Sequence, residues 1–311
     1  MSAGLIVGDR GDPHVTAVLT HLAPGCQSWV VNAATLAENS YILQDACLSV
    51  RGPQGQFMLS PQTGTRGWIR RLAPAAWQRG MVVESLEAAE KTAWLSLLTA
   101  VLRTCGVEWL TGIDALVTAE NKLVQHATAV RLGVPTPATM VTNDLSAVRE
   151  AIGPDIVLKP LGPGHFFDQN QPYTIFTTSM HTDDARLAAL AETPFIAQTR
   201  ICARLHLRVV TVGEEIWGAA LDAANQPLDW RATPIAHRSF TAAVLPTEVA
   251  HGALAVANAL GLGYSSQDWA LADEGAYLLD VNPAGQWLFL PQPIAVPVTA
   301  ALAAWLSGGP R

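Results

Sequence analysis

Three polar residues late in the chain have side chains that could bind a cation. In QDWALADEGAYLLDVNPAGQW, Asp268 falls in one apolar run and Asp280 and Asn282 fall in the next, with a turn predicted at residues 273–275. If these runs pair as a hairpin, the side chains could face one point. Carboxylate and amide oxygens are ligands that magnesium prefers. The same spacing fits solvated strand ends, although an acid flanked by aliphatic residues, as Asp280 is, is costly to bury without a cation or donors.

Two lysines lie where they could meet an anion. Lys122 is near a predicted helix start, and Lys159 ends an apolar strand just before LGPGH, whose glycines permit close backbone approach to a phosphate. For either lysine taken alone, a surface role is the alternative. The sequence contains no GxxxxGK[ST] P-loop, and no GxGxxG follows the first strand, so those two nucleotide-binding families are disfavoured.

Two arginines lie inside apolar patterns. Arg208 is part of HLRVVTV, and Arg231 follows an acid and an aromatic residue in LDWRATP. A buried arginine needs an anionic partner. That partner is either a structural one, for instance Asp222 or Asp229, or a bound phosphate or carboxylate, and both can be true in one network.

The composition limits the class of protein. The chain has 311 residues, of which half are hydrophobic and 14% are charged, so we expect a compact protein of two or three domains. Acids exceed bases by 26 to 19 and no Lys/Arg run occurs, so we expect neither a nucleic-acid nor a membrane partner. The four cysteines form no CxxC and are interpreted as ordinary buried thiols of a cytoplasmic protein. The ten tryptophans are interpreted as packing residues.

Strands and helices must position the polar residues named above. Apolar runs and turn signals predict strands at residues 5–8, 28–33, 138–144, 155–160, 195–201, 206–213, 215–223, 269–273 and 276–282. Helical patterns begin after the first strand and cover residues 84–104 and 247–260, and a helix starting near Ala119 should close at Gly133. The apolar stretch 294–306 is too short to span a membrane and is predicted to be a terminal helix docked on the core.

In this order the segments resemble those of the ATP-grasp ligases: AENKLVQHATAVRLGVPTPATMVTND, DIVLKP, FIAQTRI, LRVVTVG and QDWALADEGAYLLDVNPAGQW. DPHVTAV, WIRRL, PTPATMVTND, LDWR and NPAGQW are most similar to the ATP-grasp maturases that cross-link ribosomal peptides, the graspetide or microviridin type. The resemblance covers nearly the whole chain. It implies an α/β fold with an N-terminal pre-ATP-grasp domain at residues 1–115, a central domain at 116–200 and a C-terminal mixed-sheet domain at 201–311.

The resemblance also implies a role for each candidate residue on the nucleotide side. Residues implied to contact ATP are Lys122, Lys159, Gln198, Ile201 and Asn282, with Gln198 and Ile201 at the adenine pocket. Residues implied to hold magnesium are Asp268, Asp280 and Asn282, although related chains commonly have Glu where this chain has Asp280. His206 occupies a position that carries a ribose-binding acid in related enzymes.

The implied chemistry is ATP-dependent bond formation. Lys159 and Arg208 would stabilise charge on the transferred phosphoryl group, and Arg231 would lie near the phosphate or the substrate carboxylate. An Asp or Glu side chain of a precursor peptide would be activated as an acyl phosphate and joined to a hydroxyl or an amine. Asp183 and Asp184 would receive the leader segment of that peptide, or else belong to a helix N-terminus. Relatives of this kind are often homodimers.

Two other functions stay open from the sequence. The first is an ATP-grasp ligase that joins free amino acids or a small carboxylate to an amine, because such an enzyme shares every residue on the ATP side. The second is a nucleotide-binding scaffold without catalysis, suggested by His206 and by the aspartate at position 280.

Overall fold

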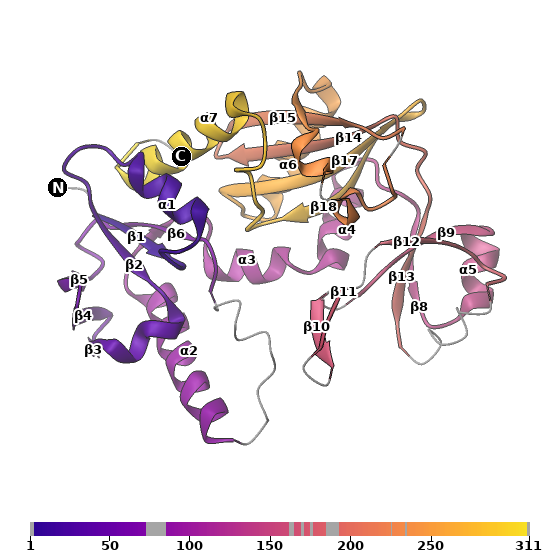
Figure 1. Cartoon of the computed structure of the whole chain (residues 1–311). Helices are drawn as coiled ribbons and strands as arrows, with labels where there is room; N and C mark the ends of the chain where they lie inside the picture. The colour runs from indigo at the N-terminus through magenta and orange to yellow at the C-terminus, as the bar shows by residue number, and fades with distance from the viewer. Residues whose placement is uncertain are drawn as a thin grey trace.

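The computed structural model describes residues 3–72, 85–161, 165–168, 171–174, 177–184, 193–224, 226–233 and 235–309. These residues form several separate sheets with helices packed between and around them (Figure 1). No helix within these ranges is long and apolar enough to cross a membrane. The predicted strands and helices are found close to their expected places, with the differences described below.

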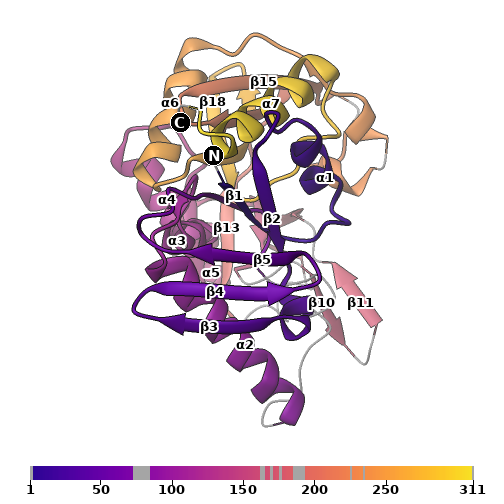
Figure 2. The same ribbon diagram turned by 90° about the vertical axis from the view of Figure 1, so that its left-hand side faces the viewer.

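The N-terminal part contains a parallel sheet of order β2-β1-β6-β7 and an antiparallel sheet of order β3-β4-β5, whose strands run across the direction of β2 in Figure 2. Their strands are β1 (Ala3–Val7), β2 (Gln27–Val31), β3 (Ser40–Gln44), β4 (Cys47–Gly52), β5 (Gly55–Leu59), β6 (Arg66–Ile69) and β7 (Glu108–Trp109). Helix α1 (Pro13–Thr20) follows β1, and α2 (Leu86–Thr104) packs on η1 (Ala33–Glu38). Helix α1 begins with Pro13 at its first position and with Asp12 accepting a hydrogen bond from the amide of His14.

The helix predicted to begin near Ala119 and to close at Gly133 is α4 (Lys122–Arg131), and a short helix that was not predicted, α3 (Ile113–Ala119), precedes it. Two residues, Glu120 and Asn121, separate the end of α3 from the start of α4. The break has a local cause, because the Asn121 side chain accepts hydrogen bonds from the amides of Leu123 and Val124 and so starts a new helix. Gly133, with φ of 68°, closes α4 as predicted.

The central part is a four-stranded antiparallel sheet of order β12-β9-β13-β8 with α5 on it, next to the hairpin β10-β11. Its elements are β8 (Thr139–Thr142), α5 (Leu145–Ala151), β9 (Asp155–Lys159), β10 (His165–Asp168), β11 (Gln171–Thr174), β12 (Thr178–His181) and β13 (Phe195–Thr199). In Figure 1 this part lies to one side of the C-terminal sheet.

The C-terminal sheet has the order β16-β15-β14-β17-β18. Its elements are β14 (Leu205–Val212), β15 (Glu215–Asp222), η4 (Trp230–Ala232), η5 (Ala236–Arg238), β16 (Thr241–Ala242), α6 (Thr247–Ala259), β17 (Tyr264–Ala272) and β18 (Gly275–Asn282). Every described strand pair in it is antiparallel, whereas a mixed sheet was expected. The reason is that short turns join β14 to β15 and β17 to β18, and a tight turn can only pair strands in opposite directions.

Helix α7 (Gln292–Leu306) connects the N-terminal part with the C-terminal sheet. It packs against β14 and β15 of the C-terminal sheet and against α1, β1 and β6 of the N-terminal part. Its buried residues include Leu302 and Trp305, which share one apolar core with Ile6, Val15 and Val210. This shared core fixes the N-terminal part against the face of the C-terminal sheet that α7 covers.

The cysteines correct one prediction. All four are free, but only Cys105 is buried, while Cys47 and Cys202 are exposed and Cys26 is partly exposed. Cys47 starts β4 on the face opposite the buried Leu48, so strand alternation turns it outward.

Candidate active site

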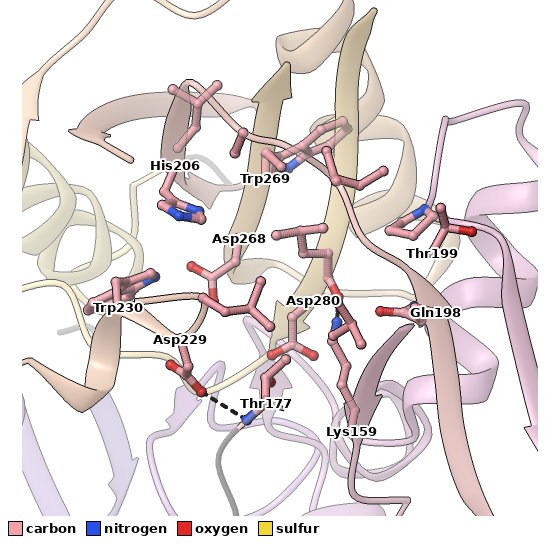
Figure 3. Close-up of a pocket in the computed structure, with 18 of the residues that line it drawn as sticks. Lys159, Thr177, Gln198, Thr199, His206, Asp229, Trp230, Asp268, Trp269 and Asp280 are labelled. Atoms are coloured by element: carbon pink, nitrogen blue, oxygen red, sulfur yellow. Dashed lines mark hydrogen bonds between the residues drawn. The ribbon is translucent and has the colours of Figure 1, made fainter. Parts of the chain in front are cut away.

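A cleft with an open space of about 860 Å³ lies between the central sheet and the C-terminal sheet (Figure 3). It is lined by seven of the residues that the sequence singled out: Lys122, Lys159, Gln198, Ile201, His206, Asp268 and Asp280. These come from α4, β9, β13, β14, β17 and β18 and from the segment after β13. The fold therefore gathers residues that are far apart in the chain around one space.

The row Arg208, Asp268 and Asp280 crosses three neighbouring strands. Arg208 pairs with Asp268 across β14 and β17, and Asp268 pairs with Asp280 across β17 and β18. Asn282 pairs with Ser266, two residue pairs farther along β17 and β18. Residues paired in this way project from the same face of a sheet, so the two carboxylates and the amide share one face.

A β-bulge makes this arrangement possible. From the turn, β17 and β18 pair regularly as far as Trp269 and Leu278, but the next pair is Asp268 with Asp280. Leu279 is the extra residue, and it lines the cleft together with Asp280. Without the bulge, Asp268 would face Leu279, and Asp280 would turn to the opposite face of the sheet.

Arg208 holds the first carboxylate in place. Its side chain is 7% exposed, and its Nη1 donates to Asp268 Oδ1 at 2.9 Å. Its Nη2 donates to the carbonyl of Gln286 at 3.3 Å. Its Nε is buried and has no hydrogen-bond partner among the residues that the structure describes. The structural partner of Arg208 is thus Asp268.

The lysines reach the cleft from the central part. Lys159, the last residue of β9, donates from Nζ to the carbonyl of Leu279 at 3.0 Å, so the bulge also supplies an anchor for this ammonium group. Lys122 is the first residue of α4, where the positive end of the helix dipole adds to its own charge. Burial, followed by the charge of Lys159, lowers the pKa of His126 on α4. This corner of the cleft therefore favours an anion.

Much of the cleft wall is apolar, which suits a planar ring. Leu207, Trp269 and Ala270 line it beside Gln198 and Ile201. The Gln198 side chain donates to Thr139 Oγ1 at 2.9 Å, which fixes it against β8. Apolar walls with a few polar groups are the usual lining of a small-molecule site.

His206 faces the same cleft from the start of β14. Burial lowers its pKa, and the negative charges of Asp268 and Asp229 oppose this shift without cancelling it. The imidazole is therefore neutral at pH 7 and can both donate and accept a hydrogen bond.

Asp229, Trp230 and Thr177 line the cleft as well but were not predicted as site residues. Asp229 is 6% exposed, and its Oδ2 accepts a hydrogen bond from the amide of Thr177 at 3.3 Å, as Figure 3 shows. In the sequence, Asp229 lies between a leucine and a tryptophan in LDWR, a pattern that predicts only a partner for an arginine. The side chain of Arg231 lies outside the described residues.

Asp183 and Asp184 do not line the cleft. Asp183 forms an ion pair with Arg149 and lies 3.4 Å from His181 Nδ1, and both acids follow β12. The segment 185–192, where a helix was an alternative, lies outside the described residues. Their role in binding a leader stays a prediction.

The polar row fits a magnesium ion that a nucleotide helps to coordinate. Among the described residues, no group of three or more His, Cys, Asp or Glu side chains could hold a metal alone. Asp268 and Asp280 nevertheless offer hard oxygens on one face, and Asn282 Nδ2 donates to Asp280 Oδ2 at 3.2 Å. Magnesium is commonly held by one or two carboxylates plus substrate phosphates. The buried, unpartnered Nε of Arg208 beside this set also fits an anionic ligand.

Comparison with known proteins identifies the fold. No protein-family profile matches the sequence, and no curated protein does either. A RiPP-associated ATP-grasp ligase from Chryseobacterium gregarium, in complex with ADP and a leader and core peptide, superposes with a TM-score of 0.87 at 21% identity, covering 100% of this chain and 98% of the other. The macrocyclase MdnC from Microcystis aeruginosa MRC, bound with precursor peptide MdnA, gives 0.81 at 20% identity, covering 98% and 99%.

A more distant likeness has the same architecture. D-alanine–D-alanine ligase from Bacillus anthracis, complexed with ATP, gives a TM-score of 0.58 at 13% identity, covering 98% of this chain and 95% of the other. The chain therefore has the ATP-grasp fold.

Proposed function

We propose that this protein is an ATP-dependent ligase that forms an ester or amide cross-link within a ribosomally made precursor peptide. The observation that carries the proposal is that one cleft is lined by Lys122, Lys159, Asp268 and Asp280. Arg208 forms an ion pair with Asp268. The full-length likeness to a ligase bound to ADP and peptide, and to a macrocyclase bound to its precursor, supports it.

ATP would lie along the cleft. Its base would pack on the apolar part of the wall near Gln198 and Ile201, and its phosphates would lie between Lys122 and Lys159. Neutral His206, which also lines the cleft, would hydrogen-bond a ribose hydroxyl. Magnesium held by Asp268, Asp280 and Asn282 would neutralise phosphate charge.

The basic residues would then assist phosphoryl transfer. An Asp or Glu carboxylate of the peptide attacks the terminal phosphorus, ADP leaves, and an acyl phosphate forms. A hydroxyl or amine of the same peptide next attacks the acyl carbon and loses its proton, and inorganic phosphate leaves. Lys159 and Arg208 stabilise the charge on the transferred group, and Arg231 would bind the phosphate or the carboxylate. The peptide loses one water overall.

The remaining assignments belong to the same proposal. Asp183 and Asp184 would bind the leader segment. The ion pair between Asp183 and Arg149 supports this, because Asp183 is placed to bind a basic side chain. The division into domains at residues 115 and 200 and the homodimer stay predictions. The paired charges of the cleft favour an enzyme over a scaffold that only binds nucleotide.

ADP release tests the proposal. The purified chain, with ATP and magnesium, would be given either candidate precursor peptides encoded near its gene or a panel of free amino acids, and the products would be weighed by mass spectrometry. We expect ADP with the peptide and a product lighter by one water. ADP released only with small acids would favour a ligase of free amino acids, and no release with either would favour the scaffold. The variant Asp280→Asn serves as the control for contaminating ATPase.

A further inference from the structure

A buried charged cluster in the N-terminal part contacts the turn that follows the proposed magnesium ligands. It consists of Asp12, His14 and Arg70, from the start of α1 and the end of β6. His14 and Arg70 are 6% and 3% exposed. None of the three lines the cleft, and the mechanism proposed above does not use them.

Hydrogen bonds inside the cluster fix the tautomer of His14. Its Nδ1 lies 2.9 Å from Asp12 Oδ1, and Arg70 Nε lies 3.1 Å from Asp12 Oδ2. Arg70 Nη2 is farther from Nδ1, at 3.3 Å. Because a carboxylate only accepts, we assign the ring proton to Nδ1, which leaves Nε2 as an acceptor.

The remaining hydrogen-bonding atoms of His14 and Arg70 contact the turn at residues 283–288. His14 Nε2 accepts from the amides of Trp287 at 3.3 Å and Leu288 at 3.5 Å. Arg70 Nη1 donates to the carbonyl of Ala284. The His14 ring also lies edge-on to Trp287, with centroids 4.5 Å apart. The N-terminal cluster thus holds both halves of the turn.

The other side of the same turn touches the polar row of the cleft. Arg208, which binds Asp268, donates to the carbonyl of Gln286 at 3.3 Å. The turn fits closely, because a Cβ on Gly285 would lie 2.5 Å from Ser266 Cβ and 2.9 Å from Arg208 Nη2. A displacement of the turn would therefore move Arg208 and, through it, Asp268.

We propose that His14 is a positioning residue for the magnesium–nucleotide site, acting through the turn 283–288 on Arg208 and Asp268. This inference rests on the proposed function, because it assigns His14 a part in holding that site's ligands. Burying His14 and Arg70 with a partly buried Asp12 is costly, and an apolar cluster of equal volume would pack the core at lower cost. This cost is explained if the cluster serves to hold the backbone amides and the carbonyl of the turn in one position.

Four variants test the proposal. His14→Phe keeps an aromatic ring but loses the ring's hydrogen bonds to Asp12 and to the two amides of the turn, and His14→Asn can reach Asp12 but is too short to reach the turn. His14→Gln retains one donor and one acceptor at nearly the original reach. Val101→Ala truncates a buried residue of α2 that belongs to another core cluster, and so controls for loss of packing in the N-terminal part.

Two measurements are needed. Hydrogen–deuterium exchange on the ligand-free chain reports the amides of Trp287 and Leu288, and calorimetric titration of ADP at several magnesium concentrations reports the magnesium requirement. We expect His14→Phe and His14→Asn to speed exchange at these amides and to raise the magnesium needed for half-saturation about tenfold or more. ADP binding in a chelator should not change, and His14→Gln and Val101→Ala should match wild type.

Each other outcome contradicts the inference or the function separately. If wild type binds magnesium–ADP but neither His14→Phe nor His14→Asn needs more magnesium, His14 has no positioning role, whatever the exchange shows. An equal rise in Val101→Ala would also overturn the inference, because any loss of packing would then suffice. A wild-type chain that binds no ADP with magnesium contradicts the proposed function, and unchanged exchange in His14→Asn independently contradicts the contact with the turn. His14→Asn decides the test if His14→Phe does not fold.

Discussion

The two carboxylates of the cleft have different neighbours although they stand opposite each other. Asp268 carries an ion pair with the buried Arg208, whereas Asp280 accepts a hydrogen bond from the neutral amide of Asn282. Losing one charge of a buried ion pair leaves the other charge uncompensated, whereas the hydrogen-bond donor to Asp280 is a neutral amide that carries no charge to be left uncompensated. The two residues should therefore differ in their effect on stability while sharing an effect on function.

We expect Asp268→Asn to lower the free energy of unfolding by about 3 kcal/mol and Asp280→Asn to change it little. Both should reduce ADP formation about a hundredfold or more, because each removes a negative magnesium ligand. Urea unfolding and the ADP assay measure the two effects. Equal stability of the two variants would contradict the ion-pair argument, and near-normal rates in both would contradict the metal assignment.

The acid sensitivity of the fold should depend on Asp12. Burial tends to raise its pKa, but the hydrogen bond from His14 and the charge of Arg70 outweigh burial and lower the pKa from 3.8 to about 2. A carboxyl with a lowered pKa in the folded state stabilises the fold above pH 4 and loses that effect as the pH falls toward 2. The size is about 2 kcal/mol, from 1.36 kcal/mol per pKa unit.

Asp12→Asn should remove this pH-dependent part. Unfolding by urea, measured between pH 5 and pH 2.5, should show a shallower loss of stability in the variant than in wild type. Parallel curves would mean that Asp12 titrates normally in the folded chain. Asp9→Asn, at an exposed neighbouring acid, is the matched control.

At the scale of elements, the hairpin β17-β18 could be predicted from the sequence, but its geometry could not. The alternating pattern and the turn at 273–275 locate both strands, and they bring Asp268 near Asp280. Which face each acid occupies depends on the bulge at Leu279, and YLLDVN is compatible with either register. Helix α3 was not predicted, and the cap at Asn121 sets the start of α4 three residues after the expected start near Ala119.

Residues that depend on tertiary contacts were also hidden in the sequence. Asp229 becomes a cleft residue only because the segment after β15 folds back to meet Thr177. Lys159, by contrast, was predictable, because a lysine at the end of a buried strand must emerge where the strand meets solvent.

The turn at Gly285 gives a prediction at the same scale. Gly285→Ala should lower the free energy of unfolding by about 1–3 kcal/mol, because the new methyl group collides with Ser266 and Arg208. It should also weaken magnesium-dependent ADP binding, since Arg208 must move. Gly112→Ala, where no atom lies within 4 Å of the added Cβ, is the control. Unchanged unfolding and binding in Gly285→Ala would show that the turn yields easily.

For the whole molecule, the cleft lies between separate sheets, so a ligand that bridges them should stabilise their arrangement. Lys159 already crosses from the central sheet to the carbonyl of Leu279, and Asp229 reaches back to Thr177. A nucleotide bound only by the folded chain adds about 2.7 kcal/mol at a hundred times its dissociation constant.

Magnesium–ATP should therefore raise the melting temperature, and a chelator should remove most of the rise. Differential scanning fluorimetry measures both effects over a range of ATP concentrations. Lys159→Met, which keeps the length of the side chain without its charge, should respond less than wild type. A rise that is the same with and without the chelator would contradict a role for the metal in nucleotide binding.

Helix α7 has a consequence for how the chain is made. Gly4 of β1 packs on Leu306, and Arg66 at the start of β6 donates to the carbonyl of Trp305 and stacks 4.3 Å from its ring. The face of β1 that carries Ile6 therefore has no finished surface to pack on until α7 is made, on the order of tens of seconds later at the usual rates of synthesis. During that interval the apolar face of the N-terminal sheet is exposed, so a nascent chain stalled before residue 292 should bind a chaperone that recognises apolar segments.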